Sequence, residues 1–371
     1  MMINTERMIN NFLTYIQIDS ESQNEKAICD YVSQQMKDLG FSVQIDNAGE
    51  KINSNGYNIC IKQPGDINKD AILLSAHLDT VIPGQGIKPI IEGDLIKTDG
   101  STILGGDDKA GVAIIVECLQ VIKEKQLSSR PIEAVFSICE EIGLKGAKEF
   151  DTDVLTAKEG IVIDAGGAIG LIDIEGPAQN MINVDIYGKS AYTEVDPDVG
   201  ISAIQIAAHA LEHMKLHPAD DRTTVNFGVI HGGVAANIIA DHVHLVGEIH
   251  SLDVMELVNQ TEHIKTIFEA AASDLGGSVN FNIERTYNAF SVDENSKLVR
   301  DLKQAFIDNG FQPKCVPYGG GSDTNIYSEK GIVCINLSCG MSLAHTTNES
   351  IKKSDIEACA KSLLTFLLNS H

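Results

Sequence analysis

Short apolar runs alternate with amphipathic stretches along the first half of the chain. The run at 71–76 is apolar and brief, which is typical of a strand buried in a parallel sheet. Residues 111–123 then predict a helix, and 132–138 and 160–163 predict two further buried strands. This strand-helix-strand order indicates an α/β fold with a mostly parallel open sheet covered by helices.

Both ends of the chain also contain amphipathic and short apolar stretches. The first fifteen residues predict a helix with Met8, Phe12 and Leu13 on one side, and residues 333–337 predict another strand. The pattern Ser354-x-x-Glu357 predicts a capping box that opens the last helix.

The middle of the chain has a different periodicity. Apolar and polar residues alternate at 182–186 and again at 279–283, as they do in half-buried strands. The predicted order is strand-helix-strand-strand-helix-strand, a ferredoxin-like α+β unit inserted into the first domain. We therefore expect one domain formed by residues 1–173 and 290–371, interrupted by a second at 174–289.

Composition narrows the possible partners and compartment. The chain has 371 residues, and 52 acidic against 28 basic side chains give a net charge of −24. Such a charge repels phosphate backbones and anionic lipids, so we expect no nucleic acid and no membrane as partner. Apolar runs stay short of the roughly 18 residues that span a bilayer. Eight cysteines without a Cys-x-x-Cys pair, and a start unlike a signal peptide, predict a soluble cytoplasmic protein.

Histidine and carboxylate residues occur where the predicted strands end, and in one glycine-rich loop. They come from five segments: His77-Leu78-Asp79, the loop 105–109 with Asp107, Glu140-Glu141, Asp164, and His345. Each segment alone has an ordinary explanation as a turn, a solvated face or a complement to a helix dipole. Because the carboxyl ends of strands share one edge of an open sheet, we expect the five to meet there.

Imidazole and carboxylate together are a donor set for Zn²⁺, with Mn²⁺ or Co²⁺ as alternatives. Two ions about 3.5–4 Å apart would need a bridging carboxylate. A glutamate beside a ligand glutamate would take a proton from metal-bound water and pass it to a leaving amine.

The motifs resemble those of the M20 metallopeptidases, in particular their peptidase T-like, or tripeptide aminopeptidase-like, branch. The matching stretches are SAHLDT at 75–80, GGDDKAG at 105–111, EEIG at 140–143, VIDAGG at 162–167 and GGGSD at 319–323, with His345 beyond. The resemblance covers nearly the whole chain.

The resemblance implies a role for each matching residue. His77, Asp107 and Asp164 would hold one metal ion, and Asp107, Glu141 and His345 the other, with Asp107 as the bridge. Glu140 would be the general base for the water between the ions, and Asp79 would orient the ring of His77. The bond between Asp107 and Asp108 would be cis.

The inserted domain would be the family's lid, which often mediates formation of a homodimer. Asn237 would contact substrate, and Gly320 and Gly321 would let backbone approach it closely. Two lid positions depart from the family pattern. Tyr192 stands where the family has a histidine that stabilises the oxyanion, often from the partner subunit, and His250 stands where an arginine commonly grips a substrate carboxylate.

The expected function is hydrolysis of short peptides by a zinc-dependent aminopeptidase, through a metal-bridging water activated by Glu140. One alternative is a deacylase or amidohydrolase of the same family that acts on N-acyl amino acids. The other is a catalytically impaired homologue with a binding role, which Tyr192 and His250 motivate.

Overall fold

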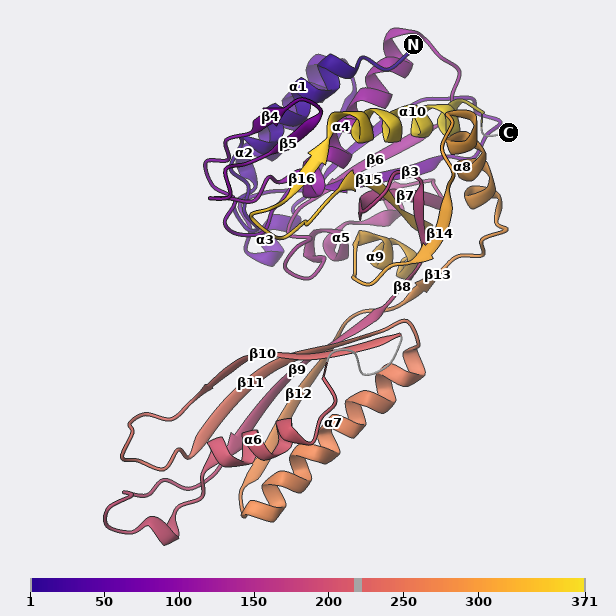
Figure 1. The fold of residues 1–371 in the computed structure, drawn as a ribbon. Helices are drawn as coiled ribbons and strands as arrows, with labels where there is room; N and C mark the ends of the chain where they lie inside the picture. The colour runs from indigo at the N-terminus through magenta and orange to yellow at the C-terminus, as the bar shows by residue number, and fades with distance from the viewer. Residues whose placement is uncertain (1, 217–221, 370–371) are drawn as a thin grey trace. The chain divides into compact units, whose positions relative to one another are not determined.

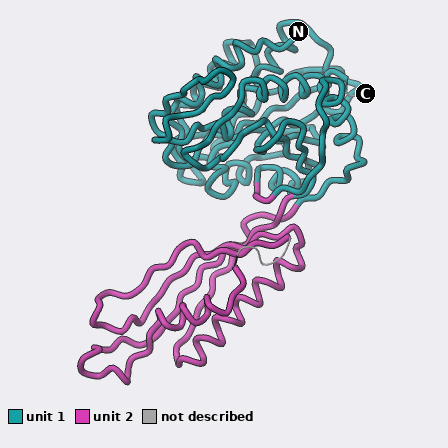
Figure 2. The backbone as a smooth tube through the Cα atoms, in the orientation of Figure 1, with its two compact units in different colours: residues 1–175, 290–318, 322–371 teal, residues 176–289, 319–321 magenta. Residues whose placement is uncertain are grey.

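The computed structural model describes residues 2–216 and 222–369. Two compact units are drawn in different colours in Figure 2. Unit 1 comprises residues 1–175, 290–318 and 322–371, and unit 2 comprises 176–289 and 319–321. The domain bounds predicted from the sequence, 1–173 with 290–371 and 174–289, differ from these units by a few residues and remain a prediction.

Unit 1 is built on a nine-stranded mixed sheet (Figure 1). Its order along the main path is β1 (Ser42–Ile45), β2 (Ile59–Gln63), β6 (Ile132–Ser137), β3 (Ile72–His77), β7 (Glu159–Gly166), β15 (Val333–Met341), β8 (Leu171–Gly176) and β13 (Phe290–Ser291), with β14 (Lys314–Pro317) paired to β8. The four central strands β6, β3, β7 and β15 are parallel. Their residues are almost entirely buried, as expected for strands covered on both faces. The predicted α/β class is confirmed.

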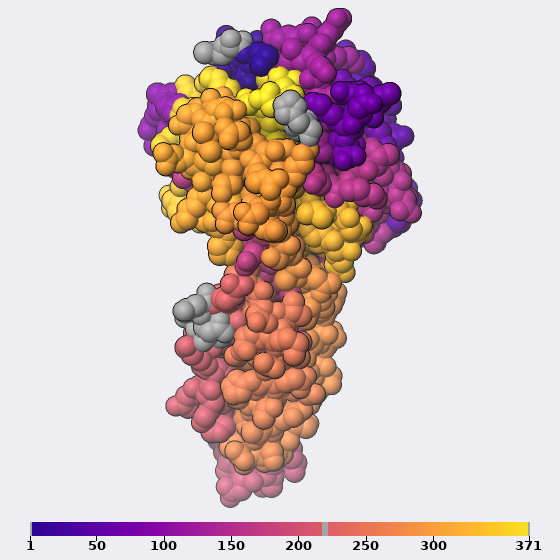
Figure 3. All heavy atoms as spheres, turned by 90° about the vertical axis from the view of Figure 1, so that its right-hand side faces the viewer, coloured from indigo at the N-terminus to yellow at the C-terminus, as the bar shows by residue number. Residues whose placement is uncertain are grey.

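Helices cover both faces of this sheet. One layer contains α1 (Thr5–Ile16), α2 (Lys26–Asp38), α4 (Gly106–Glu124), α8 (Lys297–Asp308) and α10 (Lys353–Asn369), and the other contains α3 (Ala48–Ile52), α5 (Lys145–Glu149) and α9 (Asp323–Glu329). Helix α4 lies between α1, α10 and the sheet, and it is buried on all sides. A three-stranded sheet, β16 (Ser350–Lys352), β5 (Leu95–Lys97) and β4 (Ile90–Glu92), completes the unit. In Figure 3 orange atoms of the segment that begins near residue 290 form part of the surface of unit 1, beside indigo, magenta and yellow atoms.

Unit 2 is a four-stranded antiparallel sheet with two helices. Its elements are β9 (Ala178–Tyr187), α6 (Ala203–Glu212), β10 (Thr223–Gly232), β11 (His242–Ser251), α7 (Val254–Leu275) and β12 (Ser278–Tyr287). The sheet order is β10-β11-β9-β12, so the first and third strands of the unit lie in the middle. This is the ferredoxin-like arrangement that the alternating pattern indicates. Its apolar core is separate from that of unit 1.

The predicted capping box at the last helix is wrong. Helix α10 begins at Lys353, so Ser354 already lies inside it. The carboxylate of Asp94, from the turn between β4 and β5, accepts the backbone N–H of Ser354 at 3.0 Å and its hydroxyl at 2.6 Å. A side chain from another segment therefore caps this helix. No helix within residues 2–216 and 222–369 has the length and apolar character that crossing a membrane requires.

Candidate metal centre

Four neighbouring parallel strands carry the predicted metal ligands at one end of the sheet. His77 is the last residue of β3, and Asp164 lies near the end of β7. Glu141 follows β6, and His345 follows β15 in a loop where it has a φ of 63°. Since these strands are adjacent and parallel, their carboxyl ends bring the side chains together.

The fifth predicted ligand, Asp107, comes from the loop that opens α4. The peptide bond between Asp107 and Asp108 is cis, as the resemblance implies. The carboxylate of Asp108 accepts the backbone N–H groups of His77 at 3.2 Å and Gly111 at 3.1 Å. It thereby ties the end of β3 to the start of α4, beside the side chain of Asp107.

The five side chains form two groups that share Asp107. Nε2 of His77 lies 3.0 Å from Oδ1 of Asp107 and 3.6 Å from Oδ1 of Asp164. Nε2 of His345 lies 3.2 Å from Oδ2 of Asp107 and 2.9 Å from Oε2 of Glu141. In each group the potential ligand atoms all lie within 4.8 Å of one another. Asp107 thus presents one oxygen to each group, as a bridging carboxylate would.

Histidine and carboxylate charges compensate one another in this cluster. Hydrogen bonds to Asp107 and Glu141 raise the pKa of His345 to about 10. Burial would raise the pKa of Asp107, but hydrogen bonds from His345 and His77 outweigh it and hold that pKa below its usual range. The Nδ1–H of His77 donates to the backbone oxygen of Asp79 at 3.0 Å, which leaves Nε2 directed at the carboxylates.

Burial and neighbouring carboxyl groups disfavour the charged form of the remaining acids. Burial raises the pKa of Asp164 to about 8, and burial together with nearby Asp164 raises that of Glu140 well above its usual value. Burial and Asp107 raise the pKa of Glu141, and its buried Oε1 has no hydrogen-bond partner among the described residues. A buried carboxylate oxygen without a partner, facing a set of N and O donors, fits a cation site.

Asp79 holds the backbone that carries the glutamates. Its Oδ1 accepts the N–H of Glu140 at 2.9 Å, and its Oδ2 accepts the N–H of Glu141 at 3.2 Å. The hydroxyl of Ser22 donates to Oδ2 at 2.7 Å. The carboxylate also lies 3.5 Å from Nδ1 of His77. The role predicted for Asp79, orienting the His77 ring, remains a prediction.

Two of the predicted substrate residues in the lid lie side by side. Tyr192 forms an isolated bridge with Ile238, and the N–H of Thr193 donates to the backbone oxygen of Asn237 at 3.1 Å. The Tyr192 side chain is 39% exposed, and its hydroxyl donates to Glu194 at 2.8 Å. Its hydroxyl is therefore already engaged within its own loop.

Another pair lies around the ring of Tyr287. The ring of His250 is centred 6.3 Å from that of Tyr287, and burial lowers the pKa of His250. A Cβ on Gly321 would lie only 2.2 Å from the same ring, so only glycine fits there. Gly320 belongs to the same short segment, 319–321.

Tyr192 and His250 lie at opposite ends of the sheet of unit 2. His250 is paired with Gln179 at the start of β9, whereas Tyr192 follows Tyr187 at its end. Eight residues of extended strand span about 26 Å, so Tyr192 and His250 of one chain are too far apart to contact the same short peptide.

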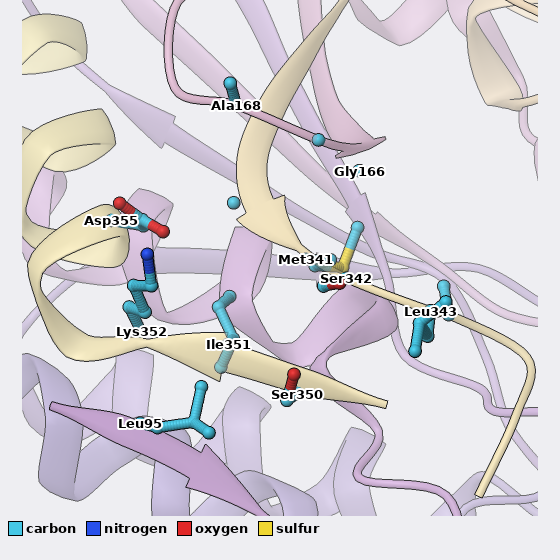
Figure 4. Close-up of a pocket in the computed structure, with 13 residues that line it drawn as sticks. Leu95, Gly166, Ala168, Met341, Ser342, Leu343, Ser350, Ile351, Lys352 and Asp355 are labelled. Atoms are coloured by element: carbon cyan, nitrogen blue, oxygen red, sulfur yellow. The ribbon is translucent and has the colours of Figure 1, made fainter. Parts of the chain in front are cut away.

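A pocket of about 530 Å³ lies beside the ligand-bearing segments (Figure 4). Residues 166–168, just beyond Asp164, and 342–344, just before His345, form part of its wall. Figure 4 shows the side chains of Lys352 and Asp355 next to one another on one side of the pocket. The pocket has an apolar lining with two charged side chains, and its wall does not include the predicted ligands themselves.

Comparison with protein-family models matches residues 73–369 to peptidase family M20/M25/M40. This match covers far more than half of the chain. The chain belongs to the M20 peptidase family. The predicted resemblance is thereby confirmed, and the family places the chain among metallopeptidases.

Several proteins are similar to this chain over almost its full length. Protein YqjE of Bacillus subtilis is 36% identical over 366 residues, which is 99% of both chains. The solved structure of a tripeptidase from Staphylococcus aureus has 37% identity and a TM-score of 0.95, with 99% of both chains covered. The aminopeptidase PepT of Bacillus cereus has 37% identity, a TM-score of 0.90 and the same coverage.

The M20 motifs did not point to every residue that shapes the centre. Glu349 accepts three backbone N–H groups from the Asp107 loop, and Asp108 ties that loop to β3. Asp108 was visible only as a neighbour of Asp107. The one available signal for Glu349 was a carboxylate four residues after His345.

Proposed function

We propose that this M20 peptidase is a two-metal aminopeptidase that releases N-terminal residues from short peptides. The observation that carries the proposal is the pair of ligand groups that share Asp107, with Glu140 next to Glu141. Zn²⁺ is the proposed ion, with Mn²⁺ or Co²⁺ as functional replacements, because the donors are imidazole nitrogens and carboxylate oxygens. The tripeptidase and PepT relatives support short peptides as substrates.

Five side chains would hold the ions. His77 and Asp164 would bind one, Glu141 and His345 the other, and Asp107 both. When bound, the ions supply Lewis acidity at the scissile carbonyl and lower the pKa of the attacking water.

Glu140 would move the proton. Asp79 accepts the backbone N–H of Glu140 and so fixes the position from which the Glu140 carboxylate would reach the attacking water. Glu140 would take a proton from the attacking water and deliver it to the amine that leaves when the peptide bond breaks.

The active form would be a homodimer joined through unit 2. Tyr192 and His250 lie at opposite ends of the sheet of unit 2, so one short peptide would contact both only if a second chain supplied one of them. Exposed apolar residues of the lid, including Val195, Ile230 and Val234, support a contact surface there. A cytoplasmic location is part of the proposal, because all eight cysteines are unpaired thiols.

A matched peptide panel tests the proposed activity. Di-, tri- and tetrapeptides would be compared with the N-acetylated form of each, and with N-acetyl amino acids. We expect rapid release of N-terminal residues from free tripeptides and at least tenfold slower cleavage of the acetylated partners. Preference for N-acyl amino acids would instead support the amidohydrolase alternative. No turnover by protein that binds two ions would support the impaired homologue.

A further inference from the structure

Glu349 lies beneath the loop that presents Asp107. Its Oε2 accepts the backbone N–H groups of Leu104 and Gly105, each at 2.8 Å. Its Oε1 accepts the N–H of Asp107 at 3.0 Å. The side chain is only 1% exposed, so these three donors replace the water that the carboxylate has lost.

This carboxylate serves as the N-terminal cap of α4. The helix begins after Gly105, which has a φ of 72° and offers no side chain to accept a hydrogen bond. A negative charge at this position complements the partial positive charge of the helix start. The cap comes from a segment 242 residues away from Asp107 in the sequence.

The same short turn carries His345. The segment from His345 to Glu349 is closed by a hydrogen bond from the N–H of Glu349 to the oxygen of Thr346 at 3.1 Å. His345 in turn faces Oδ2 of Asp107 at 3.2 Å. One end of this turn thus contacts the side chain of Asp107, and the other end contacts its backbone.

We infer that Glu349 is a positioning residue that sets how Asp107 is presented to both metal ions. The inference rests on the proposed two-metal function. Because Asp107 offers one oxygen to each ligand group, a shift of its backbone alters both at once. Loss of the Glu349 contacts should therefore weaken the binding of both ions. Loss of a ligand that belongs to one group only, such as Asp164, should weaken mainly the binding of one ion.

Glu133 is a matched control for buried carboxylates of this kind. It is 4% exposed and accepts the N–H groups of Thr156 at 2.8 Å and Ala157 at 2.9 Å. It lies near the start of β6, at the opposite end of that strand from Glu140. Removing its charge should affect folding without moving the ligands.

The test is competition for Zn²⁺ between the full-length protein and a chromophoric chelator, with no peptide present. Glu349→Gln removes the charge, and Glu349→Asp keeps it but shortens the side chain by one methylene. Both should raise the two dissociation constants at least tenfold, as loss of supporting hydrogen bonds does in other metal sites. Glu133→Gln should leave both within about twofold, even where its thermal midpoint falls.

A third variant tests the same contact without touching Glu349. A Cβ at Gly106 would lie 2.9 Å from Oε1 of Glu349, so Gly106→Ala should displace this oxygen from the N–H of Asp107. Gly106→Ala should also raise the dissociation constants of both ions. It replaces the Glu349 variants in the test if those variants do not fold.

Three results would contradict the inference. The first is wild-type Zn²⁺ affinity in folded Glu349→Asp or Gly106→Ala, because any loss in Glu349→Gln would then come from the missing charge and not from the position of Asp107. The second is an equal loss in Glu133→Gln. The third is loss of a single ion only. If the wild-type protein binds no ion, the proposed function fails with it, so the two failures are distinguishable.

Discussion

The carboxylate of Asp79 accepts three hydrogen bonds, from the backbone of Glu140, the backbone of Glu141 and the hydroxyl of Ser22. It is fully buried, so each bond forms where water cannot replace it. The side chain therefore holds the backbone of Glu140, the proposed general base, and of Glu141, a proposed ligand, in a fixed relation. A residue that touches neither substrate nor metal can in this way control the rate.

Asp79→Asn should lower kcat more than it raises KM. The amide offers a single acceptor oxygen and places an N–H₂ group against a backbone N–H, which displaces Glu140. We expect kcat to fall about 10- to 100-fold, with KM within a few-fold, in steady-state assays on a tripeptide. Ser22→Ala, which removes only one of the three contacts, serves as the milder control. An Asp79→Asn protein with wild-type kcat would contradict this role.

Asp173 on β8 predicts a pH-dependent stability. It is 4% exposed, its Oδ2 has no partner among the described residues, and burial raises its pKa to about 7. The folded state thus keeps the proton that the unfolded chain loses near its ordinary pKa of 3.8. Stability from this group is full below pH 4 and is lost as the pH rises through 7.

Asp173→Asn should remove that dependence. Urea unfolding of the metal-free protein should show the variant more stable at pH 8, on the order of 2–4 kcal/mol, because no buried charge has to form. At pH 4, where the native carboxyl is protonated, the two proteins should be nearly equal. Equal stabilities at both pH values would contradict the burial argument.

At the scale of elements, the close contact of α4 with β7 supports the centre. A Cβ on Gly111 would lie 2.3 Å from the backbone oxygen of Ile163, the residue before Asp164. The absence of a side chain at this position lets the helix start approach the strand end that carries a ligand. Neither backbone can yield without shifting Asp107 or Asp164.

Gly111→Ala should therefore destabilise the protein, although alanine is the better helix former. In an unobstructed helix the change would stabilise by up to about 1 kcal/mol. The contact should reverse the sign and cost about 1–3 kcal/mol in denaturant unfolding, with weaker metal binding as well. A more stable Gly111→Ala protein would contradict the close contact between α4 and β7.

The strand ends were predictable because each signal is local. A buried apolar run followed by a histidine or acid places that side chain at the edge of a parallel sheet, as His77 and Asp164 show. Contacts between distant segments were not predictable in this way. Glu349 and Asp94 accept hydrogen bonds from backbone N–H groups of segments far away in the sequence. Asp94 caps the last helix in place of the capping box predicted at Ser354.

At the scale of the whole molecule, the centre lies in unit 1 while several predicted substrate residues lie in unit 2. The periodicity of the inserted segment was enough to predict its strands and helices. The proposed contacts of Tyr192 and His250 with substrate did not follow from that periodicity, because it reports only which face of a strand or helix is buried.

Restoring the family residues should raise activity. Tyr192→His would supply a donor that can carry positive charge, and His250→Arg would supply a fork for a substrate carboxylate. We expect the double variant to increase kcat/KM on tripeptides about 10- to 100-fold. Tyr192→Phe should lower it if the hydroxyl already donates. No gain from the double variant would mean that these two positions do not limit the reaction.

Metal reconstitution tests the central claim most directly. Zn²⁺ would be added stepwise to chelator-treated wild-type and Glu140→Gln proteins, with bound metal and tripeptide hydrolysis measured at each step. We predict that wild-type activity rises to a break at two ions per chain. Glu140→Gln should bind the same two ions yet act about 10²- to 10⁴-fold more slowly. Full activity without metal, or an undiminished rate in Glu140→Gln, would contradict a two-metal peptidase with Glu140 as its base.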